Sequence, residues 1–248
     1  MFSTSENRIV FRDDPVNFKD YEKDAGKPIG GQSHYTITGN YETLDDIYNT
    51  AATSLSTADK LIPGDFAYID FNADGVIDNK DMIIQKYVNY PLTTLALTLS
   101  ADWKGLGVTA MFYAPLNQYK LVPDDYAYDF PDNFVKAQPQ VGQRWNPSKI
   151  GSATVSRPSI HLHSTHNEQS NTYMYANHSY LRLKNVEVYY QLPKKWRQAL
   201  MMSKCTLFAS GNNVFTWWKG DYRIDPETGG QNIYPIVKSY TVGARFSF

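Results

Sequence analysis

A strict alternation of apolar and polar residues restricts the fold of this chain more than any other feature. Apolar side chains occupy every second position of residues 95–103, and again in 106–112. Lys104-Gly105, a tight-turn dipeptide, separates the two runs. Because successive side chains of a strand point to opposite faces, this pattern predicts an antiparallel hairpin with one apolar and one polar face.

Three further segments alternate in the same way and predict an all-β fold. They are residues 180–192, 205–212 and 240–248. In the first of them Leu181 and Leu183 fall on the polar parity, so we expect a β-bulge near Lys184 or an exit of the strand from the apolar zone. Helical periodicity is confined to residues 193–203 and, more weakly, 45–54.

Composition and charge exclude several classes of protein. The 248 residues carry 24 basic and 25 acidic side chains, a net charge of -1 that gives no field for nucleic acid. Cys205 is the single cysteine, which excludes an internal disulfide framework and a cysteine-built metal site. No run reaches the roughly 18 apolar residues of a membrane-spanning helix. Membrane β-strands need only about ten alternating residues, so a mean hydropathy of -0.48 is compatible with them.

Long polar segments separate the predicted strands. Residues 115–178 are rich in Pro, Asn, Asp, Ser and Tyr, whereas Lys104-Gly105 is short. A long stretch without structure is unusual in a compact domain. Outer-membrane barrels, in contrast, alternate short periplasmic turns with long extracellular loops. The spacing therefore favours a barrel, and the 19 tyrosines suit its wet and dry boundaries.

An acidic segment within residues 62–89 has the spacing of an EF-hand-like calcium loop. Gly75 stands where such loops turn sharply, and residues 66–69 before it predict a strand rather than the helix of a true EF-hand. The alternative is an Asx-rich turn held by its own side chains. The predicted Ca²⁺ ligands are Asp70, Asn72, Asp74, Val76 through its carbonyl, Asp78 and Asp81.

Two other clusters carry weaker signals. His161, His163, His166 and His178 could bind zinc or copper, but their polar surroundings favour solvated or substrate-facing loop histidines. The adjacent pair Asp124-Asp125 lies among aromatic residues, yet neighbours on an extended segment point opposite ways. A glycosidase needs two facing carboxylates. Since no motif joins a nucleophile to a base, we predict that the chain is not an enzyme.

Several short motifs follow one another along the chain. They are DAGKPIG (residues 24–30), PGDFAYID (63–70) running into the acidic loop, DWKGL (102–106), SYLRLKNV (179–186) leading to Leu192-Pro193, SGNNVFTW (210–217) and Tyr234-Pro235. Together they span nearly the whole chain. In this order they resemble the C-terminal barrel portion of the SusC/RagA family of TonB-dependent (TonB-linked) outer-membrane proteins.

The resemblance implies a role in nutrient import across the bacterial outer membrane, of the Bacteroidetes type. Such importers have a barrel of about 22 strands around an N-terminal plug. The plug is pulled by the TonB complex, and a SusD-like surface lipoprotein captures glycans or peptides. Residues 1–248 would then be the C-terminal part of an antiparallel transmembrane β-barrel with long extracellular loops, without signal peptide or plug. Five to seven strands cannot close such a barrel, so we expect a fragment or one piece of a split gene.

The last strand resembles the signal that the barrel-assembly machinery reads in outer-membrane proteins. Thr241, Gly243, Phe246 and Phe248 match its pattern of a polar residue, a glycine and two alternating aromatics. Recognition would proceed by strand pairing at an exposed edge. The alternative is an ordinary final strand that happens to end in phenylalanine.

A barrel assigns each strand residue to outer-membrane lipid or to the lumen. The expected lipid-facing residues are Leu95, Leu97, Leu99, Leu106, Val108, Phe112, Val186, Val188, Leu207, Val242 and Phe246. The expected aromatic girdle comprises Trp103, Tyr240 and Phe248. The expected lumen-facing residues are Thr98, Ser100, Thr109, Glu187, Tyr189, Phe208, Ser210 and Arg245.

The alternative function is a secreted or surface β-sandwich carbohydrate-binding module stabilised by calcium. The two interpretations differ in one structural respect. In a barrel the apolar residues form an exposed band. In a sandwich the same residues pack on one another in a core.

Overall fold

The computed structural model describes residues 1–55, 60–85, 88–122, 142–152, 155–156, 166–199, 201–220, 225–228 and 236–247. The chain divides into two units, which are described separately. Unit 1 comprises residues 1–6, 90–119 and 177–248, and unit 2 comprises residues 7–89 and 120–176. Within the described residues, no helix has the length and apolar character needed to cross a membrane.

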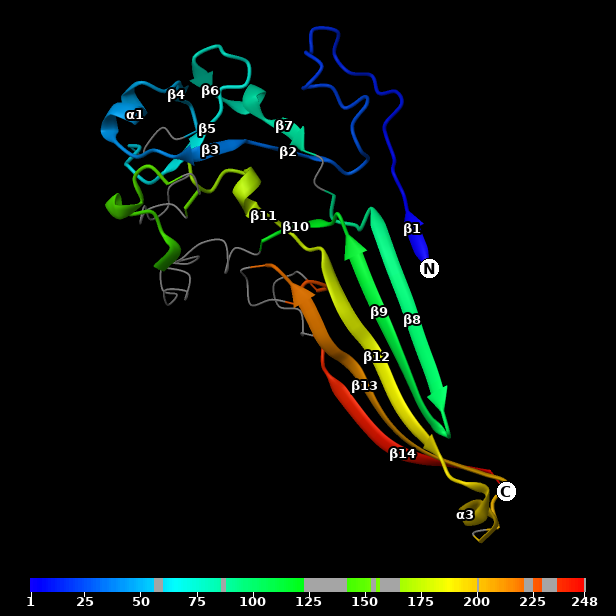
Figure 1. The fold of residues 1–248 in the computed structure, drawn as a ribbon. Coiled ribbons are helices and arrows are strands. Elements are labelled where there is room, and N and C mark those ends of the chain that lie inside the picture. Colours follow the sequence, from blue (N-terminus) through cyan, green and yellow to red (C-terminus); the bar gives the residue numbers. More distant parts are fainter. Residues whose placement is uncertain are drawn as a thin grey trace. The chain divides into compact units, whose positions relative to one another are not determined.

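Unit 1 is a six-stranded antiparallel sheet in which every strand except the short β1 is long (Figure 1). Its order is β1-β8-β9-β12-β13-β14. The strands are β1 (Phe2–Thr4), β8 (Thr93–Trp103), β9 (Leu106–Leu116), β12 (Tyr180–Gln191), β13 (Lys204–Trp218) and β14 (Ser239–Ser247). A short helix, α3 (Lys194–Ala199), connects β12 to β13. Cys205 is buried in β13, opposite Phe246 of β14.

The predicted hairpin is confirmed. Lys104 and Gly105 have φ angles of 47° and 88°, the left-handed conformation that a two-residue turn needs to match the twist of its strands. The register pairs Trp103 with Leu106 at the turn and continues to Thr93 opposite Leu116. The hairpin therefore fixes which residues of β8 and β9 share a face.

A β-bulge lies at Lys184, as one of the two sequence interpretations expected. The register shifts between Leu183 and Asn185 against both β9 and β13. The shift brings Leu183 opposite Phe112, on the same face as Val186 and Val188. It also turns Arg182 to the other face, opposite Tyr113.

The prediction that the next strand ends at residue 212 was wrong, since β13 continues to Trp218. Gly211, Asn212 and Asn213 look like a turn in the sequence. In the structure Asn213 has a φ of 52° inside the strand, beside the bulge of β12. Asparagine tolerates this conformation, so the chain passes the irregularity and resumes pairing with Phe215 opposite Leu183.

Unit 2 contains short strands and turns. The first part has β2 (Gln32–His34), β3 (Ile37–Asn40), α1 (Leu44–Tyr48), β4 (Ala52–Thr53), β5 (Phe66–Tyr68), β6 (Val76–Ile77), η1 (Asn79–Asp81) and β7 (Ile83–Gln85). The pairs are β2 with β7, β3 with β5 and β4 with β6. The later part has η3 (Pro147–Lys149) and η4 (Thr172–Met174), and β10 (Tyr119–Leu121) pairs with β11 (Tyr175–Asn177).

The core of unit 2 is aromatic. Tyr35, Phe66, Tyr68 and Ile77 are buried together. Ile77, which lies within the acidic loop, therefore points into this cluster. Because Phe66 and Tyr68 precede the acidic loop and Ile77 lies within it, the loop is anchored on a packed cluster rather than on the helices of an EF-hand.

A buried polar network joins two segments that the sequence analysis treated as separate loops. Asn167 Nδ2 donates to Asp65 Oδ1 at 2.8 Å, and Asn167 Oδ1 accepts from the Phe66 amide at 2.9 Å. The Tyr68 hydroxyl donates to the His166 carbonyl at 2.8 Å. Buried polar groups of this kind are expensive to leave unpaired. The network therefore holds the end of the long 115–178 segment on β5.

Acid should weaken unit 2 through His34. This side chain is buried beside Tyr175, 4.2 Å between ring centroids, and desolvation lowers the pKa of its imidazole to about 4. In the unfolded chain the pKa of this imidazole is near 6.5. Between pH 4 and pH 6.5 the unfolded chain therefore binds the proton more readily than the folded chain does. Unit 2 should thus keep its full stability above pH 6.5 and lose up to roughly 3 kcal/mol as the pH falls toward 4.

Hydrogen exchange of the β2 and β7 amides, corrected for the intrinsic effect of pH on exchange, measures this loss. A His34→Gln variant retains a polar side chain opposite Ser170 but cannot titrate in this range. Its protection should change less between pH 6.5 and 4. The same pH slope in both proteins would contradict the assignment.

Candidate functional site

The register of unit 1 places the predicted lipid-facing residues on one continuous face of the sheet. One row runs from Val108 through Val188 and Ala209 to Val242. The next runs from Leu106 through Tyr190 and Leu207 to Ala244. In the hairpin, Leu95, Leu97 and Leu99 face Ala114, Phe112 and Ala110. The predicted parity is confirmed for β8, β9, β12, β13 and β14.

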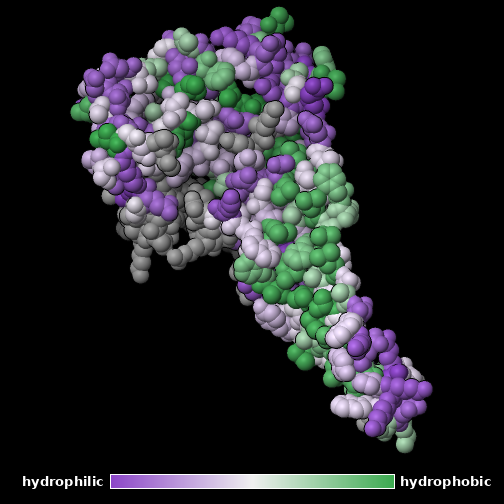
Figure 2. Space-filling view, in the orientation of Figure 1, coloured by the Kyte–Doolittle hydropathy of each residue, from purple (hydrophilic) through white to green (hydrophobic). Residues whose placement is uncertain are grey.

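This apolar face is exposed. Leu97 is 55% exposed, Leu207 47% and Val242 84%. Figure 2 shows hydrophobic side chains gathered along the sheet. An exposed apolar band of this extent marks an interaction with lipid or another apolar surface. The β-sandwich alternative requires these residues to be packed in a core, whereas in the structure they are exposed.

Aromatic residues lie near both ends of the apolar face. Trp103 stands beside the tight turn and Tyr240 near the loop end of β14, and both are exposed. Phe248, the third predicted girdle residue, lies outside the described residues. Phe215 and Trp217 of β13 are also exposed on this face, with ring centroids 4.5 Å apart. The sequence analysis missed them because it ended this strand too early.

The opposite face carries the residues predicted to line a lumen. One row runs through Ser100, Thr109, Glu187, Ser210 and Thr241. Ser100 and Thr109 hydroxyls lie 3.1 Å apart, within hydrogen-bond distance. The next row brings Tyr189 and Phe208 between Gly107 and Gly243. Thr98 lies one row toward the loops, opposite Met111.

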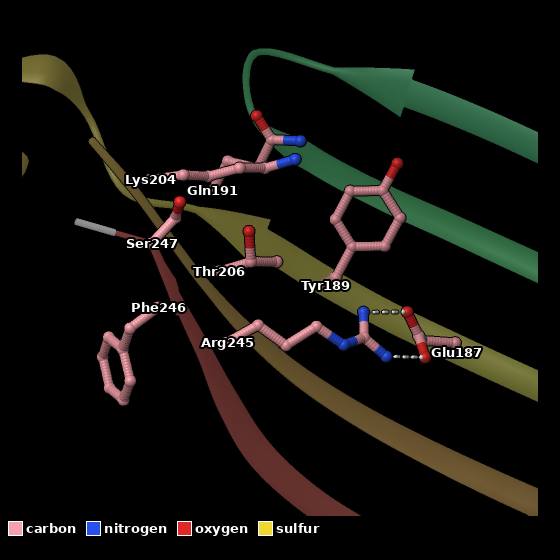
Figure 3. Close-up of a pocket in the computed structure, with 8 residues that line it drawn as sticks. All are labelled: Glu187, Tyr189, Gln191, Lys204, Thr206, Arg245, Phe246 and Ser247. Carbon is pink, nitrogen blue, oxygen red and sulfur yellow. Dashed lines mark hydrogen bonds and ion pairs between the residues drawn. The ribbon is translucent and has the colours of Figure 1, made fainter. Parts of the chain in front are cut away.

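An ion pair crosses the polar face near its turn end. Arg245 of β14 reaches over β13 and donates two hydrogen bonds to Glu187 of β12, at 3.0 and 2.9 Å (Figure 3). Its guanidinium also lies 4.0 Å from the centroid of the Phe208 ring. The Tyr189 hydroxyl donates to Asp102. These contacts link β8 to β12 and β12 to β14 through side chains.

A shallow pocket of about 340 Å³ lies beside this ion pair. Its lining comprises Glu187, Tyr189, Gln191, Lys204, Thr206, Arg245, Phe246 and Ser247 (Figure 3). Glu187 is the one carboxylate side chain among them, and it is already bound by Arg245. Among the described residues that line the pocket, no second carboxylate faces Glu187 in the way that a glycosidase requires.

Gly107 and Gly243 form slots for aromatic rings on the polar face. A Cβ on Gly107 would lie 2.2 Å from the Tyr189 ring, and one on Gly243 would lie 2.8 Å from the Phe208 ring. Glycine at these two positions lets the rings lie flat on the neighbouring strands. Gly243 was predicted as part of a barrel-assembly signal, which stays a prediction, and the structure gives it a packing role.

The acidic loop is held by its own side chains. Asp70 accepts from the amides of Asp74 and Gly75 at 3.3 and 2.8 Å. Asp81 is buried and accepts from the amides of Phe71, Asn72 and Asp78 at 2.8 to 3.2 Å. This is the arrangement that an Asx-rich turn expects, and it gives Asp81 a role in closing the loop.

Calcium binding at this loop stays a prediction. Lys80 Nζ lies 3.5 Å from Asp78 Oδ2 and 3.9 Å from Asp74 Oδ2, so its ammonium already partly neutralises the loop. Carboxylate oxygens keep further lone pairs when they accept a hydrogen bond, so the donor set still suits a hard cation. In the described part of the chain, no three His, Cys, Asp or Glu side chains are gathered as a metal site.

The histidine cluster is not one site in the described part of the chain. His161 and His163 lie outside the described residues. His166 belongs to unit 2 and His178 to unit 1. Both are buried, so the expectation of solvated histidines was wrong for these two. His166 Nε2 lies 2.7 Å from the Phe66 carbonyl, because the loop folds onto β5 rather than into solvent. Asp124 and Asp125 also lie outside the described residues.

The sequence analysis missed a second polar cluster at the loop end of the sheet. Arg182 is buried and pairs with Asp225 and Glu227. A signal was present, because Arg182 stands between two leucines on the parity of the apolar face. A charged residue at such a position is tolerated if a bulge turns its side chain to the polar face.

No family model matches this sequence, and no curated protein matches it. Solved structures do share the fold. A RagAB peptide importer in the open-open state has a TM-score of 0.61 at 20% identity, over 88% of this chain and 22% of that chain. A RagAB peptide transporter gives 0.66 at 19%, over 91% and 23%. The closed-closed importer gives 0.62 at 20%, over 91% and 24%.

The described residues therefore have the fold of part of the RagAB structures, which are transporters rather than enzymes. This chain spans about a quarter of the length of those chains. At this identity the likeness concerns the fold, which here is mostly antiparallel β-structure.

Filling a glycine slot should weaken the sheet. We expect Gly243→Ala to push the Phe208 ring away from Arg245 and to lower the free energy of unfolding by about 1–3 kcal/mol. Gly39→Ala, where a Cβ meets nothing within 4 Å, is the matched strand control and should be nearly neutral. Denaturant unfolding of the full chain in detergent measures both. Equal changes in the free energy of unfolding of the two variants would contradict the packing role of Gly243.

Proposed function

We propose that this chain is part of an outer-membrane, TonB-dependent importer of the SusC/RagA kind. The observation that carries the proposal is the single, exposed apolar face formed in register by β8, β9, β12, β13 and β14. The likeness to the RagAB transporter fold supports it. The apolar face would meet lipid, and the polar face would line the lumen.

The same comparison supports a proposal for the cargo and partners of such an importer. The RagAB structures are of a peptide importer, which puts peptides ahead of glycans as the cargo. A SusD-like surface lipoprotein would contact the loop side, and TonB would act through the plug of the complete transporter. The β14 edge, with Thr241, Gly243 and Phe246, would engage the barrel-assembly machinery.

Neighbouring substitutions on opposite faces test the orientation of the sheet. Leu97→Arg places a charge on the apolar face, where an arginine at the bilayer midplane costs about 2–4 kcal/mol. Thr98→Arg places the same charge on the polar face. We expect the first variant to lose insertion into liposomes and the second to insert like the parent chain.

Insertion is measured by flotation with liposomes and protection from added protease. Folding of both variants in detergent, followed by circular dichroism, separates failed insertion from failed folding. If Leu97→Arg inserts as well as Thr98→Arg, the apolar face is not a lipid-facing surface and the proposal fails.

We also propose that the acidic loop binds calcium near millimolar concentration. Asp70, Asn72, Asp74, the Val76 carbonyl and Asp78 would supply oxygens, with Asp81 holding the loop closed or adding one. Replacing the Lys80 contacts by a cation would stabilise four neighbouring side chains of which three are anionic.

Calorimetric titration of the full chain with Ca²⁺ tests this site. Asp70→Asn combined with Asp74→Asn should abolish binding, whereas Lys80→Ala should strengthen it by removing the competing ammonium. Asp13→Asn, outside the loop, is the control and should change nothing. No calcium-dependent heat at millimolar concentration in the parent chain would exclude the site.

A further inference from the structure

A four-residue turn between β13 and β14 is held against the polar face of the sheet. The turn, residues 225–228, contains Asp225, Pro226 and Glu227. Arg182 of β12 binds this turn from the sheet, where it lies opposite Tyr113 of β9 and Thr216 of β13. The Arg182 side chain is 1% exposed, so the contact is a buried one.

Every nitrogen of the Arg182 guanidinium has an acceptor. Nη2 donates to both carboxylate oxygens of Asp225 at 2.8 and 2.7 Å, and Nη1 donates to Glu227 Oε2 at 2.7 Å. Nε donates to Thr216 Oγ1 at 2.9 Å. Planar, charge-assisted contacts of this kind fix orientation as well as distance. Arg182 therefore sets where the turn lies on the sheet.

Two further contacts anchor the same turn. His178 Nδ1 lies 3.2 Å from the Pro226 carbonyl, which can only accept, so Nδ1 carries the proton. Lys184 Nζ lies 3.3 Å from Glu227 Oε1 and 5.0 Å from the centroid of the Tyr113 ring. Since Tyr113 is on the polar face, Lys184 points the same way. The turn is thus bound by three residues of one chain segment, His178, Arg182 and Lys184.

The charges of this cluster cancel. Arg182 and Lys184 supply two positive charges, and Asp225 and Glu227 supply two negative ones. Separating the turn from the sheet would leave the buried Arg182 guanidinium without its counter-ions. The turn is therefore held as a unit. Together with the two cationic side chains that bind it, it carries no net charge.

We propose that the 225–228 turn is a strap, folded into the lumen, that narrows the importer at its loop end, with Arg182 as the positioning residue. The inference rests on the proposed function, because the polar face is the lumen side only if the apolar face meets lipid. Cargo passing the strap meets an ion-paired, neutral turn in place of free carboxylates. Entry at this point is thus selected by size rather than by charge.

Cross-linking in the full chain tests where the strap lies. Cys205→Ser removes the native thiol, and Lys184→Cys with Glu227→Cys places two thiols across the strap contact. A short bifunctional methanethiosulfonate, applied in detergent, should link them in most molecules. Lys204→Cys with Glu227→Cys, whose first thiol lies at the turn end of the same face, should not link. Equal linking in both pairs, or none in the first, overturns the proposal.

Neutralising the anchor tests the role of Arg182. Hydrogen exchange of the Glu227 amide, which donates to Asp225 Oδ1, should rise at least tenfold in Arg182→Gln, and Arg182→Lys should restore only part of the protection because lysine lacks the fork. If Arg182→Gln fails to fold, Asp225→Asn gives the same readout with the arginine retained. Glu187→Gln, which breaks the ion pair with Arg245 on the same face, should leave exchange at the turn unchanged. Unchanged exchange in Arg182→Gln and Asp225→Asn overturns the role.

The two proposals fail separately. The cross-link and the exchange are measured in detergent and do not need a membrane. If Leu97→Arg inserts into liposomes while the strap cross-links, the lumen assignment fails and the strap is only a loop anchor, which overturns the inference as stated. If Leu97→Arg is excluded but the strap does not cross-link, the importer proposal stands and the strap fails.

Discussion

The bulge at Lys184 is the constraint on which both faces of the sheet depend. A strand has a period of two, so a slip of one residue moves every side chain beyond it to the opposite face. Without the extra residue, Leu181 and Leu183 would point toward the polar side and Arg182 toward the apolar side. Asn213 on the adjacent strand takes up a left-handed conformation at the same height, so that pairing resumes on the far side. The apolar band and the anchored turn are therefore two results of one irregularity.

The polar face is organised by a few long side chains rather than by a packed core. Arg245 spans two strands to reach Glu187, and Tyr189 and Phe208 lie over glycines. A pocket of about 340 Å³ lies beside Arg245 and Glu187 on this face. In a lumen that space would be available to a plug or to cargo.

Local patterns predicted most of unit 1, because alternation and turn chemistry act over a few residues. The hairpin at Lys104-Gly105, the parity of Val186 to Leu192 and the final strand all follow from period two. Long-range contacts left no such trace. Nothing local in Asn167 or His166 shows that they pack on Phe66, about a hundred residues earlier in the chain. The end of β13 was misplaced because an Asn-rich bulge and an Asn-rich turn share the same composition. The acidic loop was found by spacing, yet the buried, structural role of Asp81 required the fold.

Cys205 gives this sheet a built-in reporter. It is the single thiol of the chain, and it is buried where β13 meets β14. Because the thiol is buried, a thiol reagent reaches it when the structure around it opens locally. The rate of its modification would therefore report local opening at this end of β13, without an engineered probe.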